Sequence, residues 1–289
     1  MLVVILSVIT FAAVFSTSSS ENQTVRNSEA PSNIVSSVDI KKGIDSKREE
    51  FESIDIEFPD ENKITYERDE NGKFTSELDS SDLLLWNVVE SLSPSLELTK
   101  QIGELVVYYD YEDSSSASVQ SINDDNSLWS IEINYAAVED FEEFVPTVIH
   151  EYAHILSLQD SQTVSVNEAS DISQSCATLL LAEGCLSNDS YLNGFYKSFW
   201  SALPEEESTR EKSLNEAASY FEMNQNDFVS EYATTNTIED FAESYRSFVL
   251  DDRSTKETVA SMKINFLYNF ADLAQYRLSI RQTIAGWAQ

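Results

Sequence analysis

The sequence has few positive charges. Its 289 residues include 18 lysines and arginines against 51 aspartates and glutamates, a formal net charge of −33 at pH 7. Proteins bind nucleic acids mainly by neutralising phosphates with cationic side chains, so this composition argues against nucleic-acid binding. Anionic membrane surfaces would also repel the chain. The acidity fits either a saline environment, where salt screens self-repulsion, or cationic partners, and charge alone does not separate the two.

Cysteine is also scarce. Only Cys176 and Cys185 occur, in the segment SCATLLLAEGCLS, and their spacing excludes a metal site of the CxxC type. Two cysteines this close together in an exported chain are expected to form a disulfide. In a chain that stays in a reducing compartment, the same two residues would be free thiols.

The sequence has no hydrophobic run of the length that a membrane-spanning helix usually needs. The apolar run over residues 2–15 is shorter than the roughly 20 residues that a membrane-spanning helix needs, and it has the length of a signal-peptide core. We therefore expect residues 1–18 to be a signal peptide, with a membrane anchor or a buried N-terminal segment as the alternatives. A signal peptide predicts a secreted or cell-surface protein without stable membrane association after the signal is removed.

The rest of the chain divides by composition. Residues 19–50 are rich in Ser, Asn, Glu and Lys and show no sustained apolar period, which predicts a flexible polar leader. Residues 51–289 have the length and apolar content of one folded domain. Within this domain, an Asn-Gly pair predicts a hairpin over residues 64–77, and the segment SSDLLLWNVVESL predicts a helix capped by Ser80 or Ser81.

Strand patterns precede helix patterns along the domain. ELVVYYDYE, residues 104–112, predicts a strand buried on both faces, and SLWSIEINY, residues 127–135, alternates as a half-buried strand does. Residues 138–158 then predict a helix with an acidic first turn, and the chain beyond Gln159 has helical patterns. Strands followed by helices indicate an α+β fold.

Histidine occurs only twice, and both copies lie in TVIHEYAHILSLQ. His150 and His154 are four residues apart, a spacing that puts both imidazoles on one face of a helix, while Glu151 projects about 100° to the side. A zinc hydrolase needs two nitrogen ligands and a carboxylate near the water on the metal. The simpler alternative is a buried, hydrogen-bonded histidine pair, but the apolar surround would make an idle pair expensive. We therefore predict a metal site.

A catalytic zinc site usually has three protein ligands, and two candidates for the third exist. Asp160 lies six residues after His154, a position similar to that at which one group of zinc peptidases places a ligand after a glycine-assisted turn, but here Ser157 stands at the turn instead of glycine. Glu239 and Glu243 lie four apart downstream, in a segment that taken alone is an ordinary amphipathic helix with an acidic face. The spacing leaves open which of these two glutamates binds the metal.

HEYAH and the later Tyr-x6-Glu-x3-Glu of YATTNTIEDFAE resemble the gluzincin group of zinc metallopeptidases. The spacing is most similar to that of the catalytic domain of anthrax lethal factor. The cysteine-bracketed segment before the aromatic stretch SYLNGFYKSFW is closer still to exported microbial zincins. The resemblance covers about residues 80–250. It implies a zincin-like fold, in which a small mixed sheet and an active-site helix precede a mainly helical C-terminal part.

The resemblance also implies a set of ligands for one zinc ion. His150, His154 and Glu239 would bind the metal, and Glu243 would orient a ligand histidine through its other ring nitrogen. Glu151 would be the general base that removes a proton from the zinc-bound water as it attacks the scissile carbonyl. These roles describe an endopeptidase that acts on protein or peptide substrates.

Two further expectations follow from the resemblance. Tyr232 would donate a hydrogen bond to the tetrahedral oxyanion, and residues 127–135 would be the edge strand that holds the substrate backbone as an added strand. The acidic composition favours basic or extended polypeptides as substrates. The alternatives are an exported zincin-fold protein that binds a partner or a surface without catalysis, and a metal that only stabilises the fold.

Overall fold

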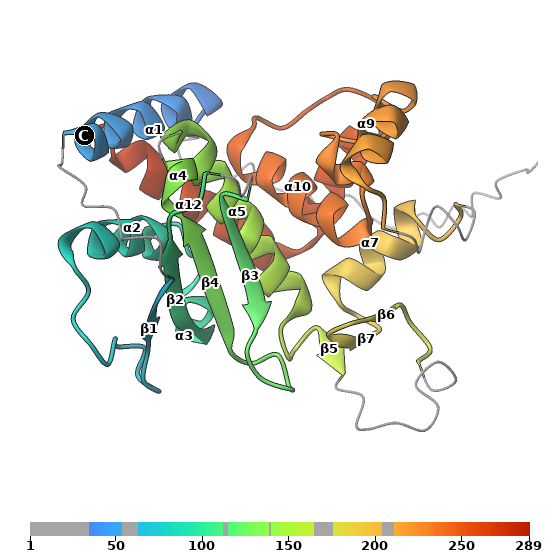
Figure 1. Ribbon diagram of the computed structural model, residues 1–289. Coiled ribbons are helices and arrows are strands. Elements are labelled where there is room, and N and C mark those ends of the chain that lie inside the picture. Colours follow the sequence, from blue (N-terminus) through green and yellow to red (C-terminus); the bar gives the residue numbers. More distant parts are fainter. Residues whose placement is uncertain (1–34, 54–62, 112–114, 139, 165–175, 204–210) are drawn as a thin grey trace, which may run out of the picture. The chain divides into compact units, whose positions relative to one another are not determined.

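The computed structural model describes residues 35–53, 63–111, 115–138, 140–164, 176–203 and 211–289. The predicted signal peptide, residues 1–18, lies outside these ranges. Among the described helices, none is long and apolar enough to cross a membrane. Residues 35–289 form one compact unit. Its elements (Figure 1) are α1 (Ser37–Glu52), β1 (Ile64–Glu67), α2 (Ser80–Ser91), α3 (Leu96–Gln101), β2 (Ile102–Tyr108), β3 (Ala117–Ser121), β4 (Trp129–Asn134), α4 (Tyr135–Val138), α5 (Phe141–Leu158), β5 (Thr163–Val164), β6 (Leu180–Leu181), β7 (Gly184–Leu186), α7 (Tyr191–Phe199), α9 (Leu214–Met223), η1 (Tyr232–Thr234), α10 (Thr237–Leu250), α11 (Val259–Phe266), η2 (Leu267–Asn269) and α12 (Ala271–Gly286).

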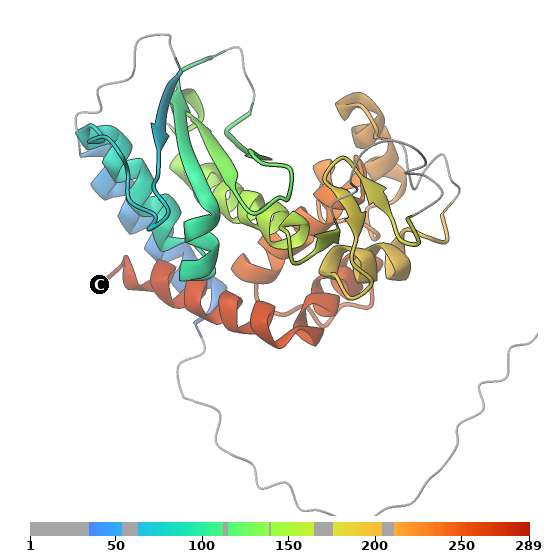
Figure 2. The same ribbon diagram turned by 90° about the horizontal axis from the view of Figure 1, so that it is seen from below.

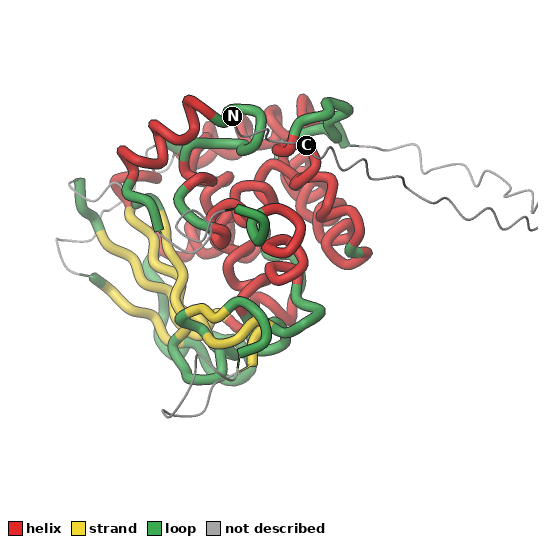
Figure 3. The backbone as a smooth tube through the Cα atoms, turned by 90° about the vertical axis from the view of Figure 1, so that its right-hand side faces the viewer, coloured by secondary structure: helices red, strands yellow, loops and turns green. Residues whose placement is uncertain are grey.

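Four strands form a mixed sheet in the order β1-β2-β4-β3. β2 runs parallel to β4, whereas β1 and β3 run antiparallel to their neighbours. Leu105, Val106 and Val107 are buried in β2, which confirms a strand buried on both faces. The strand begins at Ile102 and ends at Tyr108, so the predicted bounds of 104–112 are shifted, and residue 112 lies outside the described residues. The small mixed sheet and the many helices agree with the predicted α+β class (Figure 3).

The prediction that residues 127–135 form the edge of the sheet is wrong. β4, which these residues form, is paired with β2 on one side and with β3 on the other. The two edge strands of this sheet are β1 and β3. In β3, residues 117–121, only Ala117 is buried. A strand with one face open to water needs few apolar residues, so its serine-rich sequence carries little strand pattern.

Helix α5 lies at the centre of the unit. It contacts β3 of the sheet, and α10 packs against it from another side (Figure 1). Burial extends almost all round its second half, from Val148 and Ile149 to Ala153 and Ile155. A helix that is buried on nearly every side is a core helix. The polar residues of α5 therefore lie in surroundings with little access to water.

The prediction of a flexible leader over residues 19–50 is wrong for its last part, because residues 37–50 belong to helix α1; residues 19–34 lie outside the described ranges. Ile40, Ile44 and Phe51 are buried, and the helix contacts α12 and α5 (Figure 2). These apolar residues are spaced by four and seven positions, so they lie on one helix face. The strongly polar background between them hides this period in the sequence.

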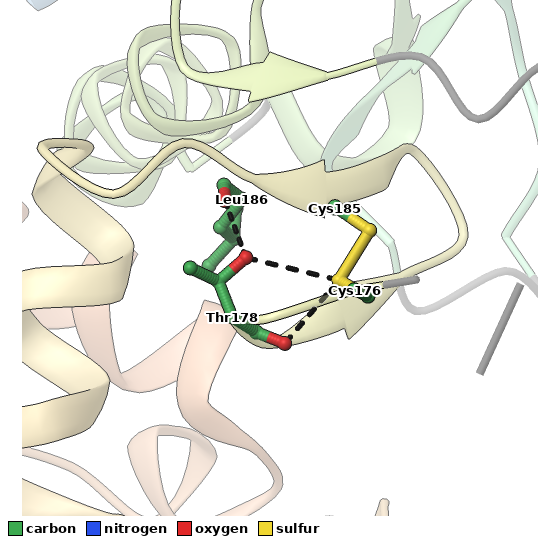
Figure 4. Close-up of a disulfide and its surroundings, with 4 residues drawn as sticks. All are labelled: Cys176, Thr178, Cys185 and Leu186. Atoms are coloured by element: carbon green, nitrogen blue, oxygen red, sulfur yellow. Dashed lines mark hydrogen bonds between the residues drawn. A yellow bond between two sulfur atoms is a disulfide. The ribbon is translucent and has the colours of Figure 1, made fainter. Parts of the chain in front are cut away.

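The prediction that the chain is helical beyond Gln159 is wrong for the segment that precedes α7. β5, β7 and β6 form a second, three-stranded sheet before α7 begins. These strands are two or three residues long, too short for an alternating pattern to be recognised. The predicted disulfide between Cys176 and Cys185 is present in this region, and the hydroxyl of Thr178 donates to the backbone carbonyl of Leu186 beside it (Figure 4).

Two local predictions are modified by the structure. The N-cap of α2 is Asp79 rather than Ser80 or Ser81, and its carboxylate accepts the backbone N–H three residues further on at 2.8 Å. The Asn-Gly turn is present with Gly72 at a φ of 76°. However, its second arm pairs through a single bridge only, and β1 finds its main partner in β2.

The close approach of α1 to α12 predicts an asymmetric response to alanine. A Cβ atom added at Gly43 would lie 1.9 Å from the backbone oxygen of Ile284, whereas one added at Gly286 would meet nothing within 4 Å. Gly43→Ala should therefore destabilise the protein by about 1–3 kcal/mol, as overpacking does. Gly286→Ala should leave stability unchanged or raise it by up to about 1 kcal/mol.

Urea denaturation, monitored by circular dichroism, measures the stability of both variants. Equal midpoints for Gly43→Ala and Gly286→Ala would contradict the packing of α1 on α12.

Candidate metal centre

Helix α5 places two imidazoles together. The Nε2 atoms of His150 and His154 lie 3.0 Å apart, and the two side chains are only 7% and 12% exposed. Positions four apart share one face of a helix, so this convergence follows from the spacing of the HExxH motif.

Helix α10 brings a carboxylate to the same point. Oε2 of Glu239 lies 3.0 Å from Nε2 of His150 and 3.4 Å from Nε2 of His154. The side chain of Asn236 caps α10 by accepting the backbone N–H groups of Ile238 and Glu239, each at 2.9 Å. The cap starts the helix at a point that puts Glu239 in its first turn.

The spacing of these three atoms fits one metal ion. Ligand atoms that surround a tetrahedral zinc ion at about 2.0 Å lie about 3.3 Å from one another. The three observed separations are 3.0, 3.0 and 3.4 Å. Glu151 is also close, since its carboxylate and the ring nitrogens of His150 and His154 all lie within 4.8 Å of one another. The cluster could therefore hold a metal ion.

The second glutamate of α10 binds the other nitrogen of the same histidine. Oε1 of Glu243 lies 2.8 Å from Nδ1 of His150. Its Oε2 accepts a hydrogen bond from the hydroxyl of Ser230 at 2.6 Å and lies 2.9 Å from the guanidinium of Arg246. Glu243 and Glu239 thus contact the two ring nitrogens of His150, Nδ1 and Nε2 respectively.

These contacts shift the pKa values of the cluster in opposite directions. Burial of the ring opposes protonation, but the hydrogen bonds to Glu239 and Glu243 outweigh it and raise the pKa of His150 to about 9. Burial likewise opposes the charged form of Glu239, yet hydrogen bonds from His150 and His154 keep the pKa of that carboxyl well below its ordinary value. A proton and any metal ion bound at this cluster would therefore compete for Nε2 of His150, since either one would neutralise the carboxylate.

Glu151 is a third buried carboxylate of the cluster. It is 7% exposed, and burial raises its pKa although the nearby charges of His154 and His150 oppose the shift. A carboxyl group whose pKa lies above the usual range takes up a proton more readily than an exposed glutamate does. The group is thus suited to accepting and returning a proton.

Tyr232 lies over the histidines from η1. Its ring centroid is 5.8 Å from that of His150, and the residue is 44% exposed. Burial of its inner part raises the pKa of the phenol, and the negative charges of Glu239 and Glu151 raise it further. The hydroxyl therefore keeps its proton at neutral pH and can donate a hydrogen bond.

A cleft of about 880 Å³ opens over the cluster. One wall is the edge strand β3 together with the residues just before it. Opposite walls come from η1 and from the start of α9 with the residues just before it. The lining residues are Ser115, Ser116, Ala117, Ser118, Val119, Thr147, His150, Glu151, His154, Glu211, Lys212, Ser213, Leu214, Ser230, Glu231, Tyr232, Thr235, Glu239, Glu243 and Arg246.

The structure thus brings together six of the predicted site residues and leaves one candidate out. Asp160 is exposed and does not line the cleft. Two contacts of the site were not predicted. Arg246 follows Glu243 by three positions, a spacing at which helical ion pairs form, so this partner was detectable from the sequence. Ser230 lies outside any helix, and no local pattern marks it.

Comparisons with protein-family models, with curated proteins and with solved structures found no match for this chain. The geometry of the cluster and the chemistry of its side chains therefore carry the functional argument.

The geometry predicts which substitutions remove a bound metal. His154→Ala and Glu239→Ala each delete one of the three converging atoms, so metal content should fall from about one equivalent to near zero. Glu243→Gln keeps the three atoms and should weaken binding about 10–100-fold without abolishing it at saturating metal. Mass spectrometry of metal content, after equilibration with Zn²⁺, Co²⁺ or Mn²⁺ and gel filtration, measures the stoichiometry.

Asp160→Asn is the matched control for these variants and should bind metal as the unmodified protein does. A loss of metal in Asp160→Asn combined with full content in Glu239→Ala would overturn the assignment of the three atoms.

Proposed function

We propose that this protein is an exported, zinc-dependent endopeptidase. The observation that carries the proposal is the convergence of His150, His154 and Glu239 within 3.0–3.4 Å of one another, with Glu151 beside them in a cleft next to the edge strand β3. The disulfide between Cys176 and Cys185 supports export, since disulfides persist in oxidising compartments.

The donor set supports zinc. Two imidazole nitrogens and one carboxylate oxygen are a usual ligand set for catalytic zinc, which leaves a fourth position open to solvent or substrate. Bound there, zinc would supply a Lewis acid that activates water and polarises the scissile carbonyl. Glu243 accepts the hydrogen bond of His150 Nδ1, which directs the lone pair of Nε2 towards the metal position.

Glu151 supplies the proton transfer. Its carboxylate accepts a proton from the water as the water attacks the carbonyl carbon of the substrate. It then passes the same proton to the nitrogen of the leaving amine, so the group ends the cycle in its starting state. Burial and a raised pKa suit both steps, because the group must bind the proton briefly and then release it.

Tyr232 stabilises the charge that develops on the substrate. Its protonated phenol lines the cleft beside His150 and donates a hydrogen bond to the oxygen of the tetrahedral intermediate. Such a donor contributes mainly in the transition state, when the oxygen carries most charge.

The edge strand supports a polypeptide substrate. Among the described residues no strand pairs with one side of β3, and apart from Val119 the side chains that line the cleft along it are small: Ser116, Ala117 and Ser118. An extended chain can add to such an edge through main-chain hydrogen bonds, which tolerate many substrate sequences.

Glu151→Gln tests the proposed reaction. The amide cannot accept the proton, so kcat for cleavage of a denatured protein should fall at least about 100-fold. Zinc content should stay at the level of the unmodified protein, because the three converging atoms are untouched. Glu143→Gln, an exposed change on the same helix, is the matched control and should cleave normally.

Undiminished turnover by Glu151→Gln would exclude this glutamate as the base. If the zinc-loaded protein cleaves no member of a peptide library, the site belongs to a metal-dependent binding protein instead.

A further inference from the structure

Ser230 makes two hydrogen bonds at once, one to the glutamate that contacts His150 and one to the turn that carries Tyr232. Its hydroxyl donates to Oε2 of Glu243 at 2.6 Å. The same oxygen accepts the backbone N–H of Ala233 at 3.1 Å. A serine hydroxyl has one proton and two lone pairs, so it can serve both partners simultaneously.

The first bond acts on the histidine. Because Oε2 of Glu243 is taken by Ser230 and by Arg246 at 2.9 Å, the carboxylate turns its other oxygen, Oε1, towards Nδ1 of His150. The position of the imidazole therefore depends on a carboxylate that is held in place from behind.

The second bond acts on the turn that carries Tyr232. Ala233 follows Tyr232 in η1 and is fully buried. A fixed backbone at Ala233 therefore also fixes the position of the neighbouring Tyr232. A second contact holds the turn at Thr234, whose hydroxyl donates to the carbonyl of Ala217 at 3.0 Å. On the side that faces Glu243, Ser230 provides the bond to the turn.

We propose that Ser230 is a positioning residue that couples the orientation of His150 to the location of Tyr232. This inference rests on the proposed function for its effect on catalysis, whereas its effect on metal binding and on the turn does not require activity. Arg246 cannot take this role, because a guanidinium only donates hydrogen bonds and so cannot accept the N–H of Ala233.

Ser230→Ala removes both bonds and is the central test. Zinc affinity, measured by competition with a chromophoric chelator, should fall about tenfold or more, the loss expected when support for a ligand histidine is removed. Hydrogen exchange of peptides that cover residues 231–235 should become faster in both metal-free and zinc-loaded protein. For peptide cleavage, kcat should fall while KM stays within about twofold, since the coupling acts on the transition state.

Two variants separate coupling from a general structural effect. Ser230→Thr keeps a hydroxyl and should restore zinc affinity, exchange and kcat towards the unmodified values. Arg246→Gln should weaken zinc binding but leave the exchange of residues 231–235 unchanged. Ser219→Ala, which removes an exposed hydroxyl on α9, is the control and should change none of these quantities.

A double-mutant cycle tests the link to Tyr232 directly. If Ser230 acts through this residue, Tyr232→Phe should lower kcat by a smaller factor in the Ser230→Ala background than in the unmodified protein. Equal factors in the two backgrounds would break the link. Should Ser230→Ala not fold, Ser230→Cys carries the same measurements with a weaker donor and acceptor.

Unchanged zinc affinity and unchanged exchange in Ser230→Ala would overturn the inference. If both change as expected but the unmodified protein cleaves no peptide, the proposed function fails and the positioning role remains.

Discussion

The packing of α10 against α5 is the constraint on which the site depends. Between the two helices, His150 lies with Glu239 at one ring nitrogen and Glu243 at the other, 3.0 and 2.8 Å away. Both carboxylates are largely buried, where charges are costly unless they are paired. The cluster therefore holds together only while the helices keep this approach. Glu243 already has the guanidinium of Arg246 at 2.9 Å, whereas Glu239 needs a cation that a proton on the histidine or a metal ion could supply.

The rotation of α10 about its own axis is set by a second buried interaction. Asp240 directly follows Glu239, so it projects about 100° away from it around the helix. Its carboxylate binds the ammonium of Lys263 and the indole N–H of Trp200, each at 2.7 Å. Burial raises the pKa of Asp240 to about 6 although Lys263 opposes the shift. Removing one partner of such a pair leaves an uncompensated buried charge, so the pair resists any rotation that would move Glu239 away from the histidines.

Strong periodic patterns were predictive, and weak or very short ones were not. The continuous apolar run of β2 and the helical spacing around His150 were recognised because one local period dominates each segment. β3 was missed because a half-exposed edge strand needs only a few apolar residues. Helix α1 was missed because Ile40, Ile44 and Phe51 stand among polar neighbours, and their role appears only when α12 lies against them.

The local geometry of the motif follows from the sequence alone, since a helix with histidines four apart must present both rings on one face. The sequence also predicted that two glutamates share a face of α10, but it left open which one meets the two Nε2 atoms of the histidines. Only the tertiary structure placed Glu239 against both Nε2 atoms and Glu243 against Nδ1, because that choice depends on how deeply and at what angle two distant helices pack. Ser230 belongs to the same category, since a turn residue acquires a role only from the groups that folding brings to it.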